Sequence, residues 1–424
     1  MKLLPLLLML ALPAVVRAQF NFTTNNDAIT ITGYTGTGGA VVIPDTTNGY
    51  PVTTIGSIAF ARNSNVSNVT IPNSITNIGV GAFGLCTNLT SIAIPGSVVS
   101  LGDHVFDGCS SLSSVTISNG VMSMGIYAFY ACGSLTNIVL GDTITNIGTY
   151  AFYHCTNLPF VSIPGSVATI QSWTFLYCTS LTNINFGYGV TQIADSAITY
   201  SGLVNLTIPG SVTSIGQNAF YHCTNLLSVS LPDSLPSIGN YAFQYCTSLT
   251  NIIIPGSVTN IGAGLFGWCT GLTSATFPEN ITSIAGYMFE YCTNLTGVFF
   301  YGNAPTNNVD LTVFIGDTNA TVYYLPGTTN WGSTLDGRPT VLWNPQAQTG
   351  DGSFGVQTNQ FGFNITGSSN LVIVVEAATN LANPVWSPVS TNTLNTFVGT
   401  NGTSYFSDPQ WTNYPTRYYR LRSP

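Results

Sequence analysis

The residues best suited to chemistry are nine cysteines, and they recur at one fixed spacing. Neighbouring cysteines lie 23 residues apart, except across one gap of 45 residues in which Ser201 stands in register. Such thiols could form disulfides or bind a metal. The nine are Cys86, Cys109, Cys132, Cys155, Cys178, Cys223, Cys246, Cys269 and Cys292.

Neither chemistry fits that spacing. A fixed period along a chain indicates stacked coils, whose equivalent side chains point in parallel, a poor geometry for a disulfide. Sulfurs in a line do not form the tetrahedron of a zinc site, and the sequence has no CxxC pair. The small residues Asn63 and Ser201 share the register. We therefore expect a structural ladder of buried thiols, no metal and no cofactor; the alternative is four disulfides and one odd cysteine.

Histidines and acids do not combine into a catalytic set. His154 and His222 have the same YHC context but lie three coils apart, about 15 Å, too far to share a proton or a metal. His104 stands near Asp103 and Asp107, where we expect a solvated loop. The sequence contains no GxSxG, HExxH, P-loop or calcium-loop motif. These observations predict that the protein is not an enzyme.

Aromatic residues recur at two positions of the repeat and are the most suggestive surface feature. One position precedes the cysteine, and the other lies two residues before a recurring phenylalanine. Stacked coils would align them into stripes that bind a ligand or, alternatively, only shield the hydrophobic wall. The candidate ligand-binding residues are Tyr127, Tyr150, Trp173, Tyr177, Tyr200, Tyr241, Tyr245, Trp268, Tyr287 and Tyr291.

The repeat itself can be understood from residues 82–105. Ala82, Phe83, Cys86 and Leu89 have the spacing of a short helical turn. The segment 91–94 then alternates small and apolar residues, as a strand with one buried face does, and a Pro-Gly pair ends it. A single coil cannot bury these residues alone, so we expect parallel strands stacked in a continuous solenoid. Its outward strand positions are small and neutral: Ser91, Ser114, Asn137, Asn183, Asn205, Ser228 and Asn251, then Thr116, Ser162, Thr207 and Thr276.

This pattern resembles a known family. The motif C-x-x-L-x-x-I-x-I-P-x-S-V-x-x-I-G-x-x-A-F, seen for example in CTSLTNIIIPGSVTNIGAGLF, is similar to the BspA-type, or treponemal, leucine-rich repeat over about residues 40–302. The resemblance implies a leucine-rich-repeat solenoid, here of about 11 coils of 23 residues with parallel strands and short helical turns. It also implies a secreted or surface protein, some members being implicated in adhesion to host or matrix proteins. The resemblance supplies no catalytic residues.

The chain divides into parts on composition and periodicity. Residues 1–18 have the layout of a secretory signal peptide with cleavage before Gln19. We expect an N-terminal cap at 19–45, repeats at 46–302, a C-terminal cap at 303–345, a linker at 346–353 and a small antiparallel all-β sandwich at 354–424. In that module Arg417, Arg420 and Arg422 are expected on a solvated, paired edge strand.

Charge and hydropathy limit the classes of partner that the protein can have. Charged residues make up 5% of the chain, and removing Lys2 and Arg17 leaves five basic against 15 acidic residues, a formal charge of −10. Such a surface repels phosphate backbones, so nucleic acid is not an expected partner. No segment after the signal peptide is apolar enough to span a membrane.

Together these features predict an exported, non-catalytic binding or adhesion protein that presents a repeat surface to a protein or carbohydrate. A structural coat or spacer protein is the alternative, and an enzyme with an unrecognised pocket is a third. The expected location is secreted or cell-surface.

Overall fold

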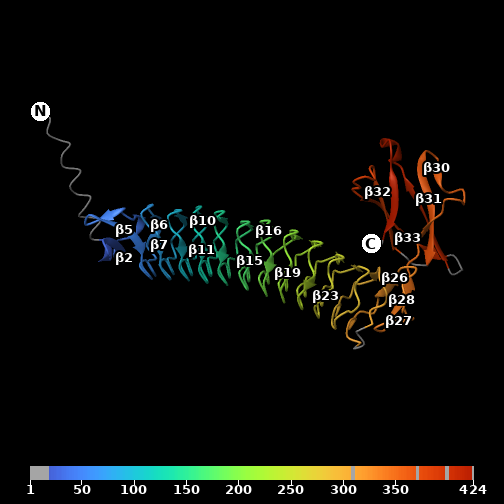
Figure 1. Cartoon of the computed structure of the whole chain (residues 1–424), viewed down its shortest axis with the longest axis horizontal. Helices are drawn as coiled ribbons and strands as arrows, with labels where there is room; N and C mark the ends of the chain where they lie inside the picture. Colours follow the sequence, from blue (N-terminus) through green and yellow to red (C-terminus); the bar gives the residue numbers. More distant parts are fainter. Residues whose placement is uncertain (1–18, 307–310, 369–371, 397–400, 423–424) are drawn as a thin grey trace.

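The computed structural model describes residues 19–306, 311–368, 372–396 and 401–422. The expected signal peptide, residues 1–18, lies outside the described residues. Figure 1 shows a long stack of coils that ends in a β module. Within the described residues, no helix has the length and apolar character needed to cross a bilayer.

One wall of the solenoid is formed by short parallel strands, one from each coil. Their register follows the repeat, so that Ser91 lies opposite Ser114 and Thr116 opposite Val139. The strands are β3 (Gly39–Val42), β6 (Val66–Thr70), β8 (Ser91–Ile94), β10 (Ser114–Ile117), β12 (Asn137–Val139), β14 (Phe160–Ile163), β16 (Asn183–Phe186), β18 (Asn205–Thr207), β20 (Ser228–Ser230), β22 (Asn251–Ile253), β24 (Ser274–Phe277) and β25 (Gly297–Phe300).

A second wall consists of even shorter parallel strands that follow the Pro-Gly turns. Each contributes one buried apolar residue, such as Leu101 or Ile170. Its strands are β5 (Tyr50–Ile55), β7 (Asn77–Ile78), β9 (Ser100–Leu101), β11 (Ser123–Met124), β13 (Asn146–Ile147), β15 (Thr169–Ile170), β17 (Gln192–Ile193), β19 (Ser214–Ile215), β21 (Ser237–Ile238) and β23 (Asn260–Ile261).

The third wall differs from the predicted short helical turns, since it contains no helix. A helix would use its backbone amides within one segment, but here alternate amides donate to the next coil: Phe83 N to Val105 O at 2.9 Å and Leu85 N to Asp107 O at 2.6 Å. Positive φ angles at two positions of each segment, for example 60° at Leu85, also interrupt a helix. Successive tight turns joined between coils replace it.

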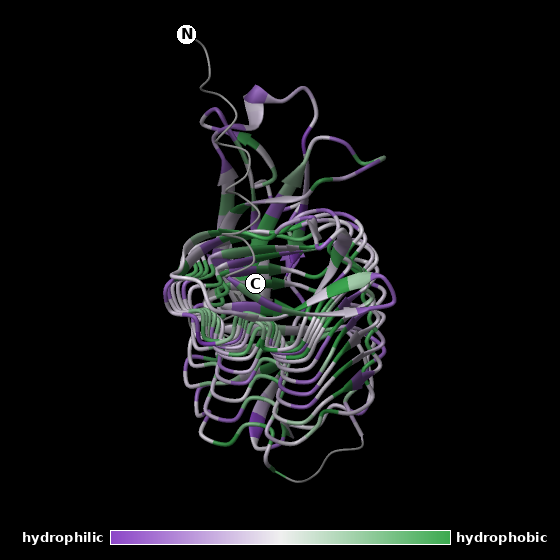
Figure 2. Cartoon of the chain, turned by 90° about the vertical axis from the view of Figure 1, so that its left-hand side faces the viewer, coloured by the Kyte–Doolittle hydropathy of each residue, from purple (hydrophilic) through white to green (hydrophobic). Residues whose placement is uncertain are grey.

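The core lies between these walls and is organised in columns. Phenylalanines of neighbouring coils stack, as between Phe129 and Phe152, whose centroids are 5.4 Å apart with an interplanar angle of 3°. The strand and turn residues Leu89 and Ile94 are fully buried beside them. Figure 2 looks along the stack and shows the coils superimposed on one another. The predicted solenoid fold is therefore confirmed, and it extends to about 13 turns.

The N-terminal end of the core is covered by a hairpin. Strands β1 (Phe20–Asn25) and β2 (Ala28–Tyr34) pair antiparallel, and β2 then joins β5 in parallel. The rings of Phe20, Tyr34 and Phe60 pack together and close the phenylalanine column. A further two-residue strand, β4 (Thr46–Thr47), pairs with β5.

The C-terminal end continues the first wall beyond the regular repeats. Strand β26 (Thr321–Tyr324) pairs in parallel with β25, and β28 (Arg338–Leu342) pairs in parallel with β26. A short strand, β27 (Thr334–Leu335), returns antiparallel to β28. The region expected to be a cap thus adds strands to the wall.

The C-terminal module consists of two antiparallel sheets with a small core. Gln346–Ala347, which the sequence places in a linker, forms β29 and pairs with β31. Phe299 of the solenoid packs with the module's core, and its ring lies 6.5 Å from that of Trp343. The elements are β29 (Gln346–Ala347), β30 (Gly355–Gln357), β31 (Gln360–Ser368), β34 (Asn395–Thr396) and β35 (Asn401–Asp408) in one sheet, β32 (Val372–Ala378), β33 (Ser387–Thr393) and β36 (Tyr418–Arg422) in the other, and a 3-10 turn at Trp411–Asn413.

Candidate functional site

Aromatic side chains on the third wall form two columns. In the first column, His104, Tyr127, Tyr150 and Trp173 stack in succession, with centroids 5.0, 4.7 and 5.0 Å apart. The interplanar angles are 18°, 4° and 4°, so each ring lies flat against the next. The predicted residues Tyr127, Tyr150 and Trp173 therefore form one continuous stack.

The second column is longer and lies before the cysteines. Its neighbouring rings have centroids 4.3 to 5.5 Å apart. Tyr130 and Tyr153 bridge the two columns, since Tyr153 lies 5.7 Å from Tyr150 and 4.4 Å from His154. The members of the second column are His154, Tyr177, Tyr200, His222, Tyr245, Trp268 and Tyr291.

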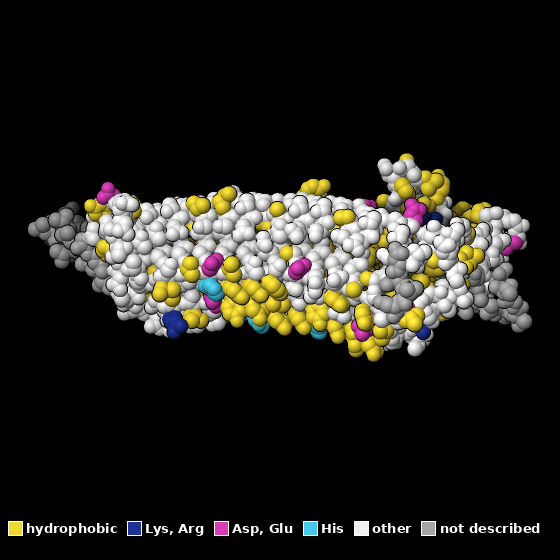
Figure 3. All heavy atoms as spheres, turned by 60° about the horizontal axis from the view of Figure 1, so that its bottom comes forward, with side chains coloured by type: hydrophobic (Ala, Val, Ile, Leu, Met, Phe, Trp, Pro, Cys, Tyr) yellow, Lys and Arg dark blue, Asp and Glu magenta, His cyan; other side chains and the backbone are white. Residues whose placement is uncertain are grey.

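Together these rings make a continuous band, which we call the aromatic stripe. Figure 3 shows a band of hydrophobic side chains along this side of the solenoid, starting near a histidine. The stripe consists of the two columns with Tyr130, Tyr153 and Tyr221. The sequence pattern also places His222 in the series that precedes the cysteines, but sequence reasoning missed the three tyrosines, His104 and His154 as members of the stripe, although Tyr130 and Tyr153 repeat at the same period.

Two predicted residues lie outside the stacks. Tyr241 and Tyr287 occupy the first-column position, but Gly264 stands between them in the stack and breaks the column. A Cβ at Gly264 would lie 2.4 Å from the ring of Tyr241, so that ring covers the glycine. Tyr287 is exposed, and no aromatic partner contacts it within the described residues.

The stripe occupies strained backbone. Its column positions have positive φ, for example 56° at Tyr127, 57° at Trp173 and 61° at Trp268. Such a conformation costs about 1–3 kcal/mol for a side chain with a Cβ. Other coils place Gly108 or Gly316 at the same position with positive φ. The fold therefore does not require aromatic rings at these positions.

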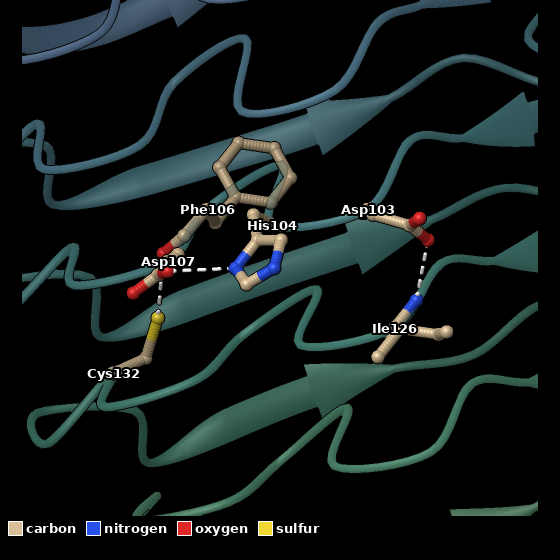
Figure 4. Close-up of polar contacts among 6 residues, drawn as sticks. All are labelled: Asp103, His104, Phe106, Asp107, Ile126 and Cys132. Carbon is tan, nitrogen blue, oxygen red and sulfur yellow. Dashed lines mark hydrogen bonds and ion pairs between the residues drawn. The ribbon is translucent and has the colours of Figure 1, made fainter.

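Asp103, His104 and Asp107 make contacts within their own coil and with the next coil. His104 Nδ1 lies 2.8 Å from Asp107 Oδ2, and Figure 4 shows the imidazole turned toward this carboxylate. Asp103 Oδ1 instead accepts the backbone amide of Ile126 in the next coil at 2.7 Å. Asp195 does the same for Gln217 at 2.8 Å. Among the described residues, no three His, Cys, Asp or Glu side chains are close enough to hold a metal ion.

The nine cysteines are buried, and each thiol has a defined acceptor. Cys132 Sγ donates to the backbone oxygen of Phe106 in the preceding coil at 3.2 Å (Figure 4). Cys132 N donates to Phe129 O, so each phenylalanine carbonyl accepts from its own coil and from the next. Burial raises the pKa of Cys86 to about 11, which keeps the thiol protonated and unreactive at neutral pH. None of the nine is in a disulfide in this structure.

We predict that all nine thiols are free and protected in the folded protein. Alkylation under native, non-reducing conditions at pH 8 should modify few cysteines, because all nine side chains are buried and inaccessible to the reagent. Alkylation after unfolding, without a reductant, should modify all nine, as measured by intact mass. Disulfide-linked peptides in the unreduced digest would contradict the thiol ladder.

Comparison with known proteins agrees with this geometry. The chain matches the BspA type leucine-rich-repeat region in six copies, over residues 42–159, 99–227 and 191–321. The chain belongs to the BspA-type leucine-rich-repeat family. A search of curated proteins finds no match.

Solved structures similar to this BspA-type chain come from bacteria. A leucine-rich cell surface protein from Faecalibacterium prausnitzii is 27% identical with a TM-score of 0.44, covering 72% of this chain and 93% of its own. A leucine-rich-repeat protein from Bacteroides ovatus is 25% identical with a TM-score of 0.41, covering 72% and 97%. The pneumococcal vaccine antigen PcpA is 20% identical with a TM-score of 0.46, covering 73% and 92%.

Proposed function

We propose that this BspA-type protein is an exported, non-catalytic binding protein whose aromatic stripe contacts a protein partner outside the cell. Residues 1–18 would direct export, residues 19–45 and 303–345 would cap the repeats, and residues 354–424, together with β29, would form a C-terminal module that packs against the end of the solenoid. Adhesion is the role that best suits an extended, rigid surface without a closed pocket.

The observation that supports the stripe as the binding surface is its run of partly exposed rings on strained backbone. Tyr127, Trp173 and Trp268 lie at positions where a glycine would relieve strain, and glycine is present there in other coils. Non-aromatic residues such as Arg62 and Leu85 share this conformation in other coils, so what distinguishes the stripe is a run of partly exposed rings. Such rings are typical of protein interfaces, where Trp and Tyr contribute most of the binding energy.

The stacking geometry favours a protein over a sugar at this surface. Sugars stack on open ring faces, but inside the columns the ring faces are covered by neighbouring rings, as between Tyr127 and Tyr150, and only the terminal rings have one uncovered face. Ring edges and phenol hydroxyls are what the stripe presents outward. A protein surface can pack against such edges and hydrogen bond to the hydroxyls.

We predict that Tyr177→Gly, Tyr245→Gly and Trp268→Gly together weaken partner binding at least about tenfold. Glycine tolerates the positive φ of these sites, so the fold should survive while the stripe is lost. The measurement is retention of mature protein on an array of fibronectin, fibrinogen, laminin and collagen, beside circular dichroism. Tyr188→Ala is the matched control, because Tyr188 is 81% exposed and lies off the stripe.

A structural spacer is the second candidate, and mutual ring stacking favours it, since stacked rings satisfy one another. In that case the triple substitution would lower the stability of the protein, and any partner of the wild-type protein would bind the variant equally well. Binding unchanged by the triple substitution would contradict the stripe as the contact surface.

A further inference from the structure

The strand wall carries a groove that lies apart from the aromatic stripe. It has a volume of 760 Å³, within the range of small-ligand sites, roughly 300–1,000 Å³. The groove lies over β14, β16 and β18 and is lined by Phe160, Thr182, Asn183, Ile184, Asn185, Phe186, Val204, Asn205, Thr207 and Pro209. Its lining contains no charged side chain.

A one-residue defect in the repeat lies beside the groove. Leu181 follows Cys178 by three residues, whereas Leu203 follows Ser201 by only two. The strand ladder is interrupted here, since β14 pairs with β16 and β18 pairs with β20, but β16 and β18 are not paired. The same wall is also unpaired between β12 and β14 and between β20 and β22, so the groove lies in the segment of the wall where the ladder is broken into short pairs. The wall is therefore irregular where the groove lies.

Phe160 stands in a row that is otherwise polar. From Asn68 to Ser274 the equivalent positions in other coils carry Ser or Asn, but the Phe160 side chain is 46% exposed on this wall and directly opposite Asn183. Unlike the rings of the stripe, it has no stacked ring on it among the described residues. The face of the Phe160 ring is therefore open to a ligand, and the ring does not fill the hydrophobic core.

Phe160 also removes a hydrogen-bond partner from its neighbour. Four outward asparagines of this wall bond to the serine of an adjacent coil, as Asn137 Nδ2 does to Ser114 Oγ at 3.3 Å. The residue one coil before Asn183 is Phe160, which offers no acceptor. Within the described residues, the Asn183 amide makes no side-chain hydrogen bond to protein, so its donors and acceptor are available beside the phenyl ring.

We propose that this groove binds a short stretch of a neutral glycan. A sugar presents an apolar face of C–H groups that fits the open face of Phe160, and adjacent hydroxyls that pair with the Asn183 amide and with Nδ2 of Asn205, whose Oδ1 already accepts from Ser228 Oγ. The absence of charged lining disfavours phosphate, acidic sugars and charged peptides. This site is independent of the stripe and of its protein partner.

The test is isothermal titration of the full mature chain with neutral hexasaccharides of β-1,4-linked glucose, mannose and N-acetylglucosamine. We expect at least one to bind wild type and Phe160→Ala to weaken it about tenfold or more, because a stacking face and its buried area are lost. Ile253→Ala is the matched control, since Ile253 is 59% exposed on the same wall in β22, outside the groove. It should leave the affinity unchanged.

Two further variants sharpen the result. Phe160→Ser restores the common residue of the row and gives Asn183 an acceptor, so it should abolish glycan binding while the fold remains intact by circular dichroism. The triple stripe variant should bind the glycan as wild type does. The proposal is overturned if no neutral hexasaccharide binds, if hexagalacturonate binds better than all three, or if Phe160→Ala and Phe160→Ser bind as wild type does.

Discussion

At pH 8 the Asp317→Asn variant is expected to be more stable than wild type by up to about 4 kcal/mol. Asp317 is 2% exposed, and neither carboxyl oxygen has a hydrogen-bond partner. Burial raises its pKa from 3.8 to about 7, although the charge of Arg338 and the backbone of Cys292 act in the opposite direction. Ionising this carboxyl in the folded state therefore costs stability.

The position of Asp317 explains its burial. It follows Phe314 by three residues, as each cysteine follows its phenylalanine, and Phe314 stacks on Phe289 at 5.6 Å. Asp317 N donates to Phe314 O at 3.0 Å, as a ladder cysteine does. Asp317 is thus the next member of the column, and a protonated carboxyl there carries a proton like the thiol of Cys292.

The pH dependence follows from the direction of the shift. Because the folded pKa lies above the unfolded value, the folded state binds more protons between about pH 4 and pH 7, and stability falls as pH rises through that range. Above pH 7 the loss is complete. Denaturant unfolding of wild type and Asp317→Asn at pH 4, 6 and 8 should show a difference that grows with pH.

Two controls make this measurement specific. Asp233→Asn removes an exposed carboxyl from a solenoid turn and should not change the pH profile. Hydrogen exchange should locate the effect of Asp317 at β25, β26 and β28, the strands of the C-terminal end. Parallel pH profiles for wild type and Asp317→Asn would show that the carboxyl is not a buried acid.

The fold could be predicted because its main signal is periodic. Cysteine and phenylalanine recur at one interval, and a solenoid is the fold that places such residues in columns, as the stacked Phe129 and Phe152 show. The prediction of short helical turns was wrong because apolar spacing does not reveal positive φ, which Tyr127 and Trp173 adopt without being glycine.

The sites were harder to predict because they depend on departures from the period. Phe160 sits in a row of Ser and Asn residues, and only the structure shows that it lines a groove with residues of the next two coils. Asp317 escaped notice because 25 residues, and not 23, separate it from Cys292. The aromatic columns were visible in the sequence, but whether ring faces or edges meet solvent depends on side-chain packing.

The stability of the C-terminal module should depend strongly on the ion pairs of one buried carboxylate, that of Glu376. We expect Arg420→Ala with Arg422→Ala to destabilise it by about 3 to 5 kcal/mol, because Glu376 is then buried without a partner. Glu376 is 4% exposed, and its oxygens lie 2.7 Å from Arg420 Nη2 and 2.6 Å from Arg422 Nε. Burial raises the pKa of Glu376, but the bonds from both arginines outweigh it and lower the pKa overall.

Arg420 and Arg422 lie on the edge strand β36, as the sequence suggested, but their charges pair with Glu376 of the neighbouring strand β32. The prediction was wrong for Arg417, which precedes β36 and whose side chain is only 10% exposed beside Asp408. Glu376→Ala should cost less than the double arginine variant, since Arg420 is 48% exposed and can reach water. Adding Glu376→Gln to the double variant should restore part of the stability by removing the stranded charge. Hydrogen exchange of β32 and β36 reports the module separately from the solenoid. If Glu376→Ala lowers the stability of the module more than the double arginine substitution does, a buried Glu376 carboxylate without a partner is not the cause of the destabilisation.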